Sequence, residues 1–311
     1  MGDYMKKIIY LTILLILLPS ITILIVNPKE KPKTYILEKN KTNIETVRVL
    51  RNKTNEIQNI ELEEYLIGVL AGEMPVSYEI EALKAQAVAA RTYTLRKKEI
   101  NKNNNYDVVD TTNDQVYLDE EYLKQTWGES YDNYINKIKQ AVKETSGEYL
   151  TYDGKIIKAF FFSTSSGTTE NCIDVFGENL PYLQSVSSTW DETSPSYLDE
   201  KTFTKQELYE KLEMPYNEKI SIEIERNSTN SIKTITINNK KILGTEFRQK
   251  LNLKSTNLEI KEEDNNIIIT SKGFGHGVGM SQFGAEQLAL LGYKYDEILK
   301  YYYQGIDLKK I

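Results

Sequence analysis

The chain contains, within its first hundred residues, the run Leu62-Glu63-Glu64-Tyr65-Leu66-Ile67-Gly68-Val69-Leu70-Ala71-Gly72-Glu73-Met74-Pro75. Counted from Leu62, its apolar residues recur at i, i+3, i+4, i+7 and i+8, which is the spacing of one helix face. We expect this helix to end before Pro75, because the proline ring restricts Met74 to extended geometry. The run therefore predicts a buried helix that stops abruptly beside Glu73.

The residues on either side predict a strand before this helix and a second helix after it. The strand is expected near Thr46–Leu50. Ser77 is the predicted N-cap of the second helix, which should run to about Lys98. Acidic residues come early in that segment and basic residues late, so both ends complement the helix dipole.

The central part of the chain mixes helical and extended patterns. We predict extended structure over Tyr106–Tyr117, with a turn at Asn113-Asp114, and a helix over Tyr131–Thr145 that ends at Gly147. Tyr149–Tyr152 and Ile156–Phe162, separated by Asp153-Gly154, have the pattern of a hairpin.

The sequence pattern changes over residues 205–270, where a short helix is followed by several β-like runs. This stretch is a possible β-rich subdomain. Helices and strands in irregular order favour an α+β fold over a doubly wound sheet. We therefore predict a single elongated α+β domain over residues 46–311.

The N-terminus has the pattern of a membrane anchor. Residues 8–26 are 19 uncharged residues that follow Lys6-Lys7. A helix of that length spans roughly 28 Å, which is enough for a hydrocarbon core. The positive-inside rule then predicts a cytoplasmic tail over residues 1–7, a polar stalk over 27–45 and a domain outside the cytoplasm. A cleaved signal peptide is the alternative, although no small-x-small site follows Val26.

Composition limits the classes of function. The chain has 45 acidic and 39 basic residues, which argues against nucleic-acid binding. Its single cysteine, Cys172, cannot form a disulfide within the chain, and one Cys with one His disfavours a structural zinc site. A nucleophilic Cys172–His276 pair stays open, but neither residue has a sequence context typical of that chemistry.

The single histidine lies in the glycine-rich run Gly273-Phe274-Gly275-His276-Gly277-Val278-Gly279-Met280-Ser281-Gln282. Alternating glycines allow close approach of backbone or ligand, and a helix is expected over Ala285–Leu290. The run does not match a nucleotide-binding loop. It predicts a ligand site, with a purely structural histidine as the alternative.

Glu73 is the strongest acid/base candidate. A helix C-terminus carries partial negative charge and the neighbours are apolar, so both effects raise the pKa of this carboxyl group. A raised pKa suits a general acid near neutral pH. The alternative is a solvated residue at a helix end.

Two polar clusters follow strand-like segments. One runs from Ser163 to Asn171 and the other from Asp110 to Tyr117. Hydroxyl and amide side chains beside an apolar strand suit the rim of a sugar-binding site, and an ordinary polar loop is the alternative.

The run at 62–75, the segment Glu81–Tyr93 and the run Gly275–Gln282 resemble the signatures of the stage II sporulation protein D (SpoIID) family. Ser163-Thr164-Ser165, Thr169-Glu170-Asn171 and Leu180–Leu183 fit in order between them. The resemblance spans roughly residues 45–305. It implies a peptidoglycan lytic transglycosylase that acts during engulfment in spore formation and leaves 1,6-anhydro ends.

The resemblance also implies roles for individual residues. The family's catalytic glutamate corresponds to Glu73. His276, Ser281 and Gln282 are expected to hold saccharides or orient Glu73, and the groove should be lined by Gln115, Ser163, Thr164 and Ser165. Asn113 and Asp114 stand where some relatives carry zinc-binding His and Cys, so zinc is not carried over. The implied mechanism requires no metal or organic cofactor.

The implied partners are peptidoglycan glycan strands, the amidase SpoIIP and the membrane protein SpoIIM, with membrane contact through residues 8–26. The expected location is the septal or engulfing membrane of the mother cell. Two alternatives remain open: a glycan-binding module that activates a partner amidase without cutting, and a carboxylate-liganded zinc hydrolase that chelators would inhibit.

Overall fold

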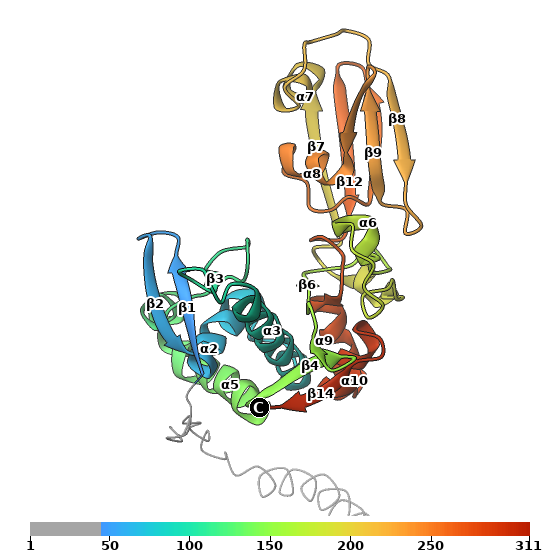
Figure 1. Cartoon of the computed structure of the whole chain (residues 1–311). Helices are drawn as coiled ribbons and strands as arrows, with labels where there is room; N and C mark the ends of the chain where they lie inside the picture. Colours follow the sequence, from blue (N-terminus) through green and yellow to red (C-terminus); the bar gives the residue numbers. More distant parts are fainter. Residues whose placement is uncertain (1–44) are drawn as a thin grey trace, which may run out of the picture. The chain divides into compact units, whose positions relative to one another are not determined.

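A computed structural model describes residues 45–311, which form the predicted α+β fold (Figure 1). The predicted tail, the anchor and all of the stalk except residue 45 lie outside the described residues. Between residues 45 and 311, no helix combines the length and apolar character needed to cross a membrane.

The first hydrophobic core is mainly helical and draws on both ends of the described chain. Its helices are α2 (Leu62–Glu73), α3 (Ile80–Ile100), α4 (Glu120–Trp127), α5 (Tyr131–Glu144), α6 (Cys172–Phe176), α9 (Gln282–Leu290) and α10 (Tyr295–Tyr302), with 3₁₀ turns at Gly128–Ser130 and Thr189–Thr193. Helix α3 contacts α2, α5, α9 and α10, so it is the central element of this core. Its small residues, among them Ala85, Ala87, Ala89 and Ala90, are fully buried and let these helices approach closely.

Small sheets surround this helical core. Their strands are β1 (Thr46–Arg51), β2 (Glu56–Glu61), β3 (Val108–Val109), β4 (Glu148–Tyr152), β5 (Lys155–Ile156), β6 (Phe161–Phe162), β13 (Met280–Ser281) and β14 (Asp307–Lys310). They form three sheets with the orders β2-β1-β3, β14-β4-β5 and β13-β6. The parallel β6–β13 pair joins the hydroxyl-rich segment after Phe162 to the glycine-rich run before Ser281.

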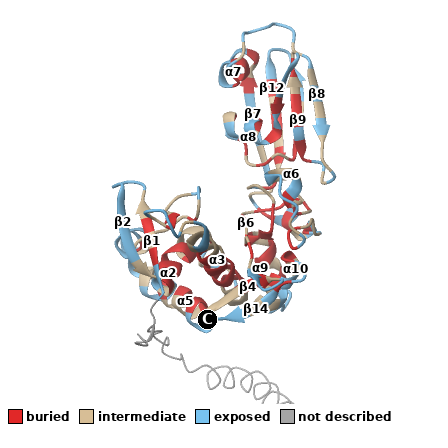
Figure 2. Cartoon of the chain, in the orientation of Figure 1, coloured by how far each residue is buried: buried red, intermediate tan, exposed pale blue. Residues whose placement is uncertain are grey.

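A second hydrophobic core lies between β6 and β13 in the sequence. Its elements are β7 (Leu198–Thr204), α7 (Lys205–Lys211), β8 (Ile222–Arg226), β9 (Ile232–Ile237), β10 (Lys240–Leu243), α8 (Gly244–Lys250), β11 (Leu258–Glu263) and β12 (Asn266–Lys272). They build two three-stranded antiparallel sheets, β11-β12-β7 and β10-β9-β8. Figure 2 shows buried residues on β9 and β12 as well as on α2, α3 and α9. A subdomain boundary at 205–270 stays a prediction.

Hydrogen bonds connect the two cores. The segment carrying the second core starts and ends at one place, because the N–H of Gly273 donates to the carbonyl of Tyr197 at 2.7 Å. The buried carboxylate of Glu170 accepts hydrogen bonds from Asn227 (2.7 Å), Thr229 and Ser231 (2.6 Å). Glu170 therefore anchors the loop before β9 to the first core.

Several sequence predictions are confirmed. The first strand lies at β1, the first helix ends at Glu73, and Met74 is extended at φ −134° and ψ 138°. The helix over Tyr131–Thr145 is α5, and α9 covers the helix expected after the glycine-rich run.

Three local predictions are wrong. Ser77 does not cap α3, which begins at Ile80 after Glu79 and without a side-chain cap. Of the extended segment Tyr106–Tyr117, two residues form a strand. The carboxylate of Asp114 accepts from the N–H of Val109 within the segment and from the hydroxyl of Tyr93 on α3, so the chain folds into a loop here. The predicted hairpin stops at Ile156, and β6 pairs with β13 instead of β4.

Two glycines let the segment 116–118 pack directly against α2. A Cβ atom on Gly68 would lie 2.4 Å from the ring of Tyr117 and 2.5 Å from the carbonyl oxygen of Leu118. On Gly72 it would lie 2.8 Å from the carbonyl oxygen of Val116. The N–H of Leu118 donates to the carbonyl of Gly68 at 3.2 Å, so this contact is between backbones. Glycine is required at both positions by space, not by backbone conformation.

We predict that Gly68→Ala destabilises the protein by about 1–3 kcal/mol, the usual cost of overpacking. Helix propensity alone predicts the opposite sign, a gain of up to about 1 kcal/mol. Urea unfolding measures the difference. The control is Glu64→Ala on the exposed side of the same helix, which should change stability by less than about 0.5 kcal/mol. A stabilised Gly68→Ala variant would contradict the close contact.

Candidate functional site

A cleft of about 1020 Å³ is lined by Glu73 and by residues far from it in sequence. Its walls come from α2 and the loop after it, β6, the loop before β7, α8, and the glycine-rich run with the start of α9. The lining residues are Ala71, Gly72, Glu73, Met74, Pro75, Ser77, Tyr78, Thr112, Asp114, Phe161, Phe162, Ser163, Thr164, Ser194, Pro195, Ser196, Arg248, Phe274, Gly275, His276, Gln282 and Phe283. The volume is at the upper end for small-molecule sites, which suits an extended ligand.

Glu73 is held in the cleft by the segment packed against α2. The N–H of Val116 donates to Glu73 Oε1 at 2.6 Å. Burial raises the pKa of the Glu73 carboxyl group, while the hydrogen bond from Val116 and the nearby amide of Gln282 lower it, and burial is the largest effect. The carboxyl group therefore keeps its proton to a higher pH than a solvated glutamate.

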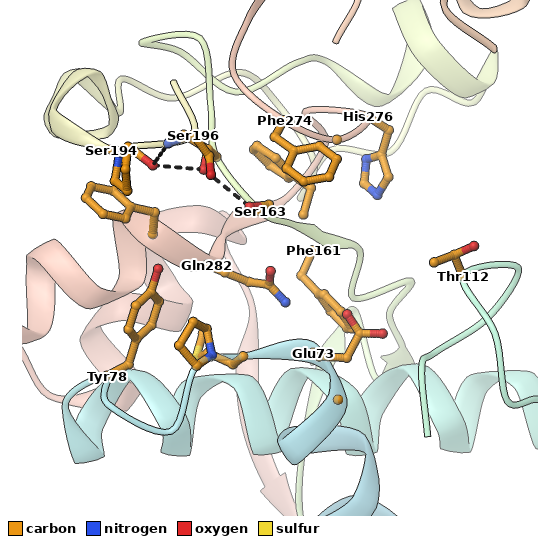
Figure 3. A pocket seen from close by; sticks show the side chains of 18 of the residues that line it. Glu73, Tyr78, Thr112, Phe161, Ser163, Ser194, Ser196, Phe274, His276 and Gln282 are labelled. Atoms are coloured by element: carbon orange, nitrogen blue, oxygen red, sulfur yellow. Dashed lines mark hydrogen bonds between the residues drawn. The ribbon is translucent and has the colours of Figure 1, made fainter. Parts of the chain in front are cut away.

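Gln282 begins α9 and faces Glu73 across the cleft (Figure 3). Its Nε2 is buried and has no hydrogen-bond partner among the described residues. Its amide still lowers the pKa of Glu73, so the two groups are close but not optimally aligned. An unpartnered buried amide donor directed into a cleft is available to a ligand.

Asp191 lies behind the cleft wall and accepts hydrogen bonds from hydroxyl groups of three segments. Its carboxylate accepts from the N–H and Oγ of Ser165, each at 3.1 Å, from Ser281 Oγ at 2.6 Å and from Ser188 Oγ. Burial raises the pKa of Asp191, and these hydrogen bonds lower it. Ser165 and Ser281 therefore fix the cleft wall from behind, and neither lines the cleft.

Ser281 also caps α9, because its Oγ accepts from the N–H of Gly284 at 3.1 Å. A Cβ on Gly284 would lie 2.9 Å from Asp191 Oδ2, so glycine is required for this approach. The cap sets the first turn of α9 and with it the direction of Gln282.

His276 stands among three phenylalanine rings, with centroids 5.3–5.9 Å from its own. Burial and the charge of Arg248 lower its pKa to about 4, against a smaller opposing effect of the Phe161 backbone. Its Nδ1 accepts from the N–H of Val278 at 3.1 Å, so the neutral ring carries its proton on Nε2. His276 lines the cleft as a neutral group at physiological pH.

The other predicted groove residues divide into two groups. Ser163 and Thr164 line the cleft, and their hydroxyls are 3.3 Å apart. Gln115 is fully buried and faces α3, where its amide bonds to Thr94 Oγ1 (2.9 Å) and the carbonyl of Ala90 (3.3 Å). Gln115 supports the segment that carries Val116 and does not line the cleft.

Several lining residues were not anticipated from sequence. Tyr78, Phe161 and Phe274 supply aromatic faces, and Arg248 supplies a cation from α8. Tyr78, Phe161 and Phe274 lie next to or within the sequence motifs described above. Their position beside these motifs could have predicted that they line the cleft. Arg248 lies in a helix with no motif, and nothing in the sequence marks it.

Asp114 also lines the cleft, but both of its carboxylate oxygens already have partners within the protein. Its Oδ1 accepts from the hydroxyl of Tyr93 at 2.8 Å and pairs with Lys97 Nζ at 2.6 Å, and its Oδ2 accepts from the N–H of Val109 at 2.8 Å. Both oxygens therefore stabilise the loop over 110–114.

The nucleophilic-cysteine alternative finds no support. Cys172 is buried, and burial raises the pKa of its thiol to about 11, so the thiol stays protonated at neutral pH. Within residues 45–311, no three His, Cys, Asp or Glu side chains are grouped to hold a metal ion. The expectation of a metal-free site stays a prediction.

Comparison with known proteins identifies the family. A model of the stage II sporulation protein family (SpoIID) matches residues 50–152, which include α2, Glu73 and α3. The stage II sporulation protein D of Bacillus amyloliquefaciens is 44% identical over 271 residues, which cover 85% of this chain and 79% of that protein. This chain belongs to the stage II sporulation protein D family. The SpoIID resemblance is thus confirmed.

Two further proteins similar to this chain come from Bacillus subtilis (strain 168). Its stage II sporulation protein D is 41% identical over 286 residues, which cover 90% of this chain and 83% of that protein. Its amidase enhancer is 31% identical over 302 residues, which cover 78% of this chain and 40% of that protein.

We predict that Glu73→Gln stabilises this SpoIID family member at neutral pH. A carboxyl group whose pKa is raised by folding contributes stability at low pH and loses it as pH rises through the folded-state pKa. Glutamine removes that loss and still accepts from Val116. Thermal unfolding should give a higher Tm for the variant near pH 7, and the gap should close near pH 4.

The exposed Glu64→Gln variant on the same helix serves as control and should shift Tm little at either pH. A Tm gap for Glu73→Gln that is constant with pH would show that Glu73 is not protonated more readily in the folded state.

Proposed function

We propose that this protein is a membrane-anchored peptidoglycan lytic transglycosylase with a cell-wall role in sporulation, and that Glu73 acts first as general acid and then as general base. Membership of the SpoIID family supports the sporulation role. One observation carries the mechanism: of the two carboxyl groups lining the cleft, Asp114 is held by three partners, whereas Glu73 is partly buried, accepts a hydrogen bond from the N–H of Val116 and has a raised pKa.

A single carboxyl group fits intramolecular attack. Hydrolytic glycosidases generally use two carboxylates, because one must activate water or attack the sugar. In the proposed reaction Glu73 protonates the glycosidic oxygen, and the bond from that oxygen to the anomeric carbon of the muramic acid breaks. The sugar's own 6-hydroxyl forms the new bond, and its proton passes to the Glu73 carboxylate. The nucleophile is already held next to its target, so the effective molarity is high.

The cleft supplies groups for the remainder of the saccharide. The amide of Gln282 and the hydroxyls of Ser163 and Thr164 can hydrogen-bond to sugar hydroxyl and acetamido groups. Phe161 and Tyr78 give apolar faces on which sugar rings can pack. Neutral His276 does not compete with Glu73 for protons above about pH 4.

The anchor at residues 8–26, a location in the septal or engulfing membrane, and cooperation with the amidase SpoIIP and the membrane protein SpoIIM belong to this proposal as expectations from the family. The alternative function is a glycan-binding module that activates a partner amidase. It is favoured by the 31% identity to a protein named amidase enhancer.

Mass spectrometry of products from peptide-free glycan strands tests the mechanism. The full-length protein in detergent should release 1,6-anhydro fragments, and Glu73→Gln should lower the rate by about 10²–10⁴-fold, the usual contribution of general acid–base catalysis. Glu64→Gln is the matched control and should retain activity.

Reducing-ended products would mean that water attacks and would overturn the transglycosylase chemistry. Binding without any product would favour the amidase-activating module. Inhibition by a chelator would favour the zinc hydrolase.

We also predict that Gly72→Ala raises the pKa of the catalytic acid. The added Cβ must displace Val116, whose N–H stabilises the ionised form of Glu73. Weakening that hydrogen bond shifts the limb of the pH–rate profile that belongs to Glu73 to higher pH and lowers kcat. A lower kcat with an unchanged pH profile would show that the glycine has a purely structural role.

A further inference from the structure

Arg248 brings a cation into the cleft from the second hydrophobic core. It lies on α8, 175 positions after Glu73 in the sequence, and lines the same cleft. Its Nε donates to the carbonyl of Leu253 at 3.2 Å, which fixes the guanidinium against the end of α8. The two terminal NH₂ groups have no acceptor among the residues described by the structure.

The charge of Arg248 is not neutralised by the protein. Within residues 45–311 no carboxylate forms an ion pair with it, whereas Lys250, two positions further along α8, pairs with Glu213 at 3.0 Å. Burial lowers the pKa of Arg248, with no acidic neighbour acting in the opposite direction. A partly buried, uncompensated cation carries a desolvation cost that an anionic ligand would offset.

The charge of Arg248 acts on another residue that lines the cleft. Its charge contributes to the low pKa of His276, which lies among the rings of Phe160, Phe162 and Phe176. Ser194 and Ser196, neutral hydroxyl residues, line the same cleft. A ligand that satisfies all of these groups carries hydrogen-bonding groups and a negative charge.

The free edge of the guanidinium indicates which anion. Its two terminal NH₂ groups match the two oxygens of a carboxylate in a bidentate pair, and such pairs are stronger than neutral hydrogen bonds. We propose that Arg248 is a specificity-determining residue that binds a carboxylate of the glycan. The proposal rests on the binding of glycan in the cleft, which is part of the function proposed above. The carboxylate comes either from the ether-linked acid of a peptide-free muramic acid or from an attached stem peptide.

Binding measurements in the inactive Glu73→Gln background test this proposal separately from catalysis. The probes are peptide-free glycan strands and the same strands with their carboxyl groups reduced to alcohols. Glu73→Gln should bind the carboxylate form about tenfold to a hundredfold more tightly, the range for a hydrogen bond to a charged group. Adding Arg248→Gln should remove this preference, and Arg248→Lys should restore part of it.

Lys250→Gln, on the same helix and outside the cleft, is the matched control and should keep the preference. Tm values establish that each variant is folded. Equal weakening of both probes by Arg248→Gln, or a preference that survives it, overturns the proposal.

Strands with intact stem peptides distinguish the two sources. A larger effect of Arg248→Gln on peptide-free strands assigns the carboxylate to muramic acid, and a larger effect on peptide-bearing strands assigns it to the peptide. The wild type could release no anhydro products while tighter binding of the carboxylate strands still depends on Arg248. That result would contradict the proposed chemistry and support this inference.

Discussion

The site depends on one contact, the direct packing of the 116–118 backbone against α2. Gly68 and Gly72 leave no side chain between the two segments, so the Val116 N–H reaches the carboxyl group of Glu73 at 2.6 Å. This hydrogen bond fixes a carboxyl group at a helix end where the dipole and burial both disfavour its charge. The protein thus holds a protonatable group in place without ionising it permanently.

The opposite wall is held by a different kind of interaction. Asp191 gathers hydroxyls from the segments around Ser165, Ser188 and Ser281, and so sets the start of α9 and the position of Gln282. Glu170 plays a comparable part toward the second core. A buried carboxylate with several donors fixes the positions of those donors, because the loss of any one of them leaves a buried charge partly unsatisfied. The cleft is therefore shaped by polar contacts laid over two apolar cores.

The sequence was sufficient for the elements with strong periodicity or a clear stop signal. The helix at 62–73 followed from apolar spacing and Pro75, and Glu73 followed from its place at that helix end. Ser77 failed because a capping residue type does not show where the first turn will pack. The β6–β13 pair was missed because it joins residues more than a hundred positions apart, which local pattern cannot relate.

The site was predictable to a similar degree. Ser163, Thr164, His276 and Gln282 do line the cleft, but the roles assigned to them stay predictions. Ser165 and Ser281 face Asp191, a partner that no motif marks, and Gln115 faces α3. The residue types predicted that these side chains form hydrogen bonds, but tertiary packing determines which partners they bind.

The hydrogen bond between Tyr197 and Gly273 has an evolutionary consequence. The chain leaves the first core and re-enters it at one point, so the 198–272 segment is an excursion whose length does not alter the path on either side. Insertions that begin and end close together are well tolerated. Changes in the length or surface residues of the 198–272 segment can therefore alter which ligands the cleft binds, while the packing around α2 and Glu73 stays the same.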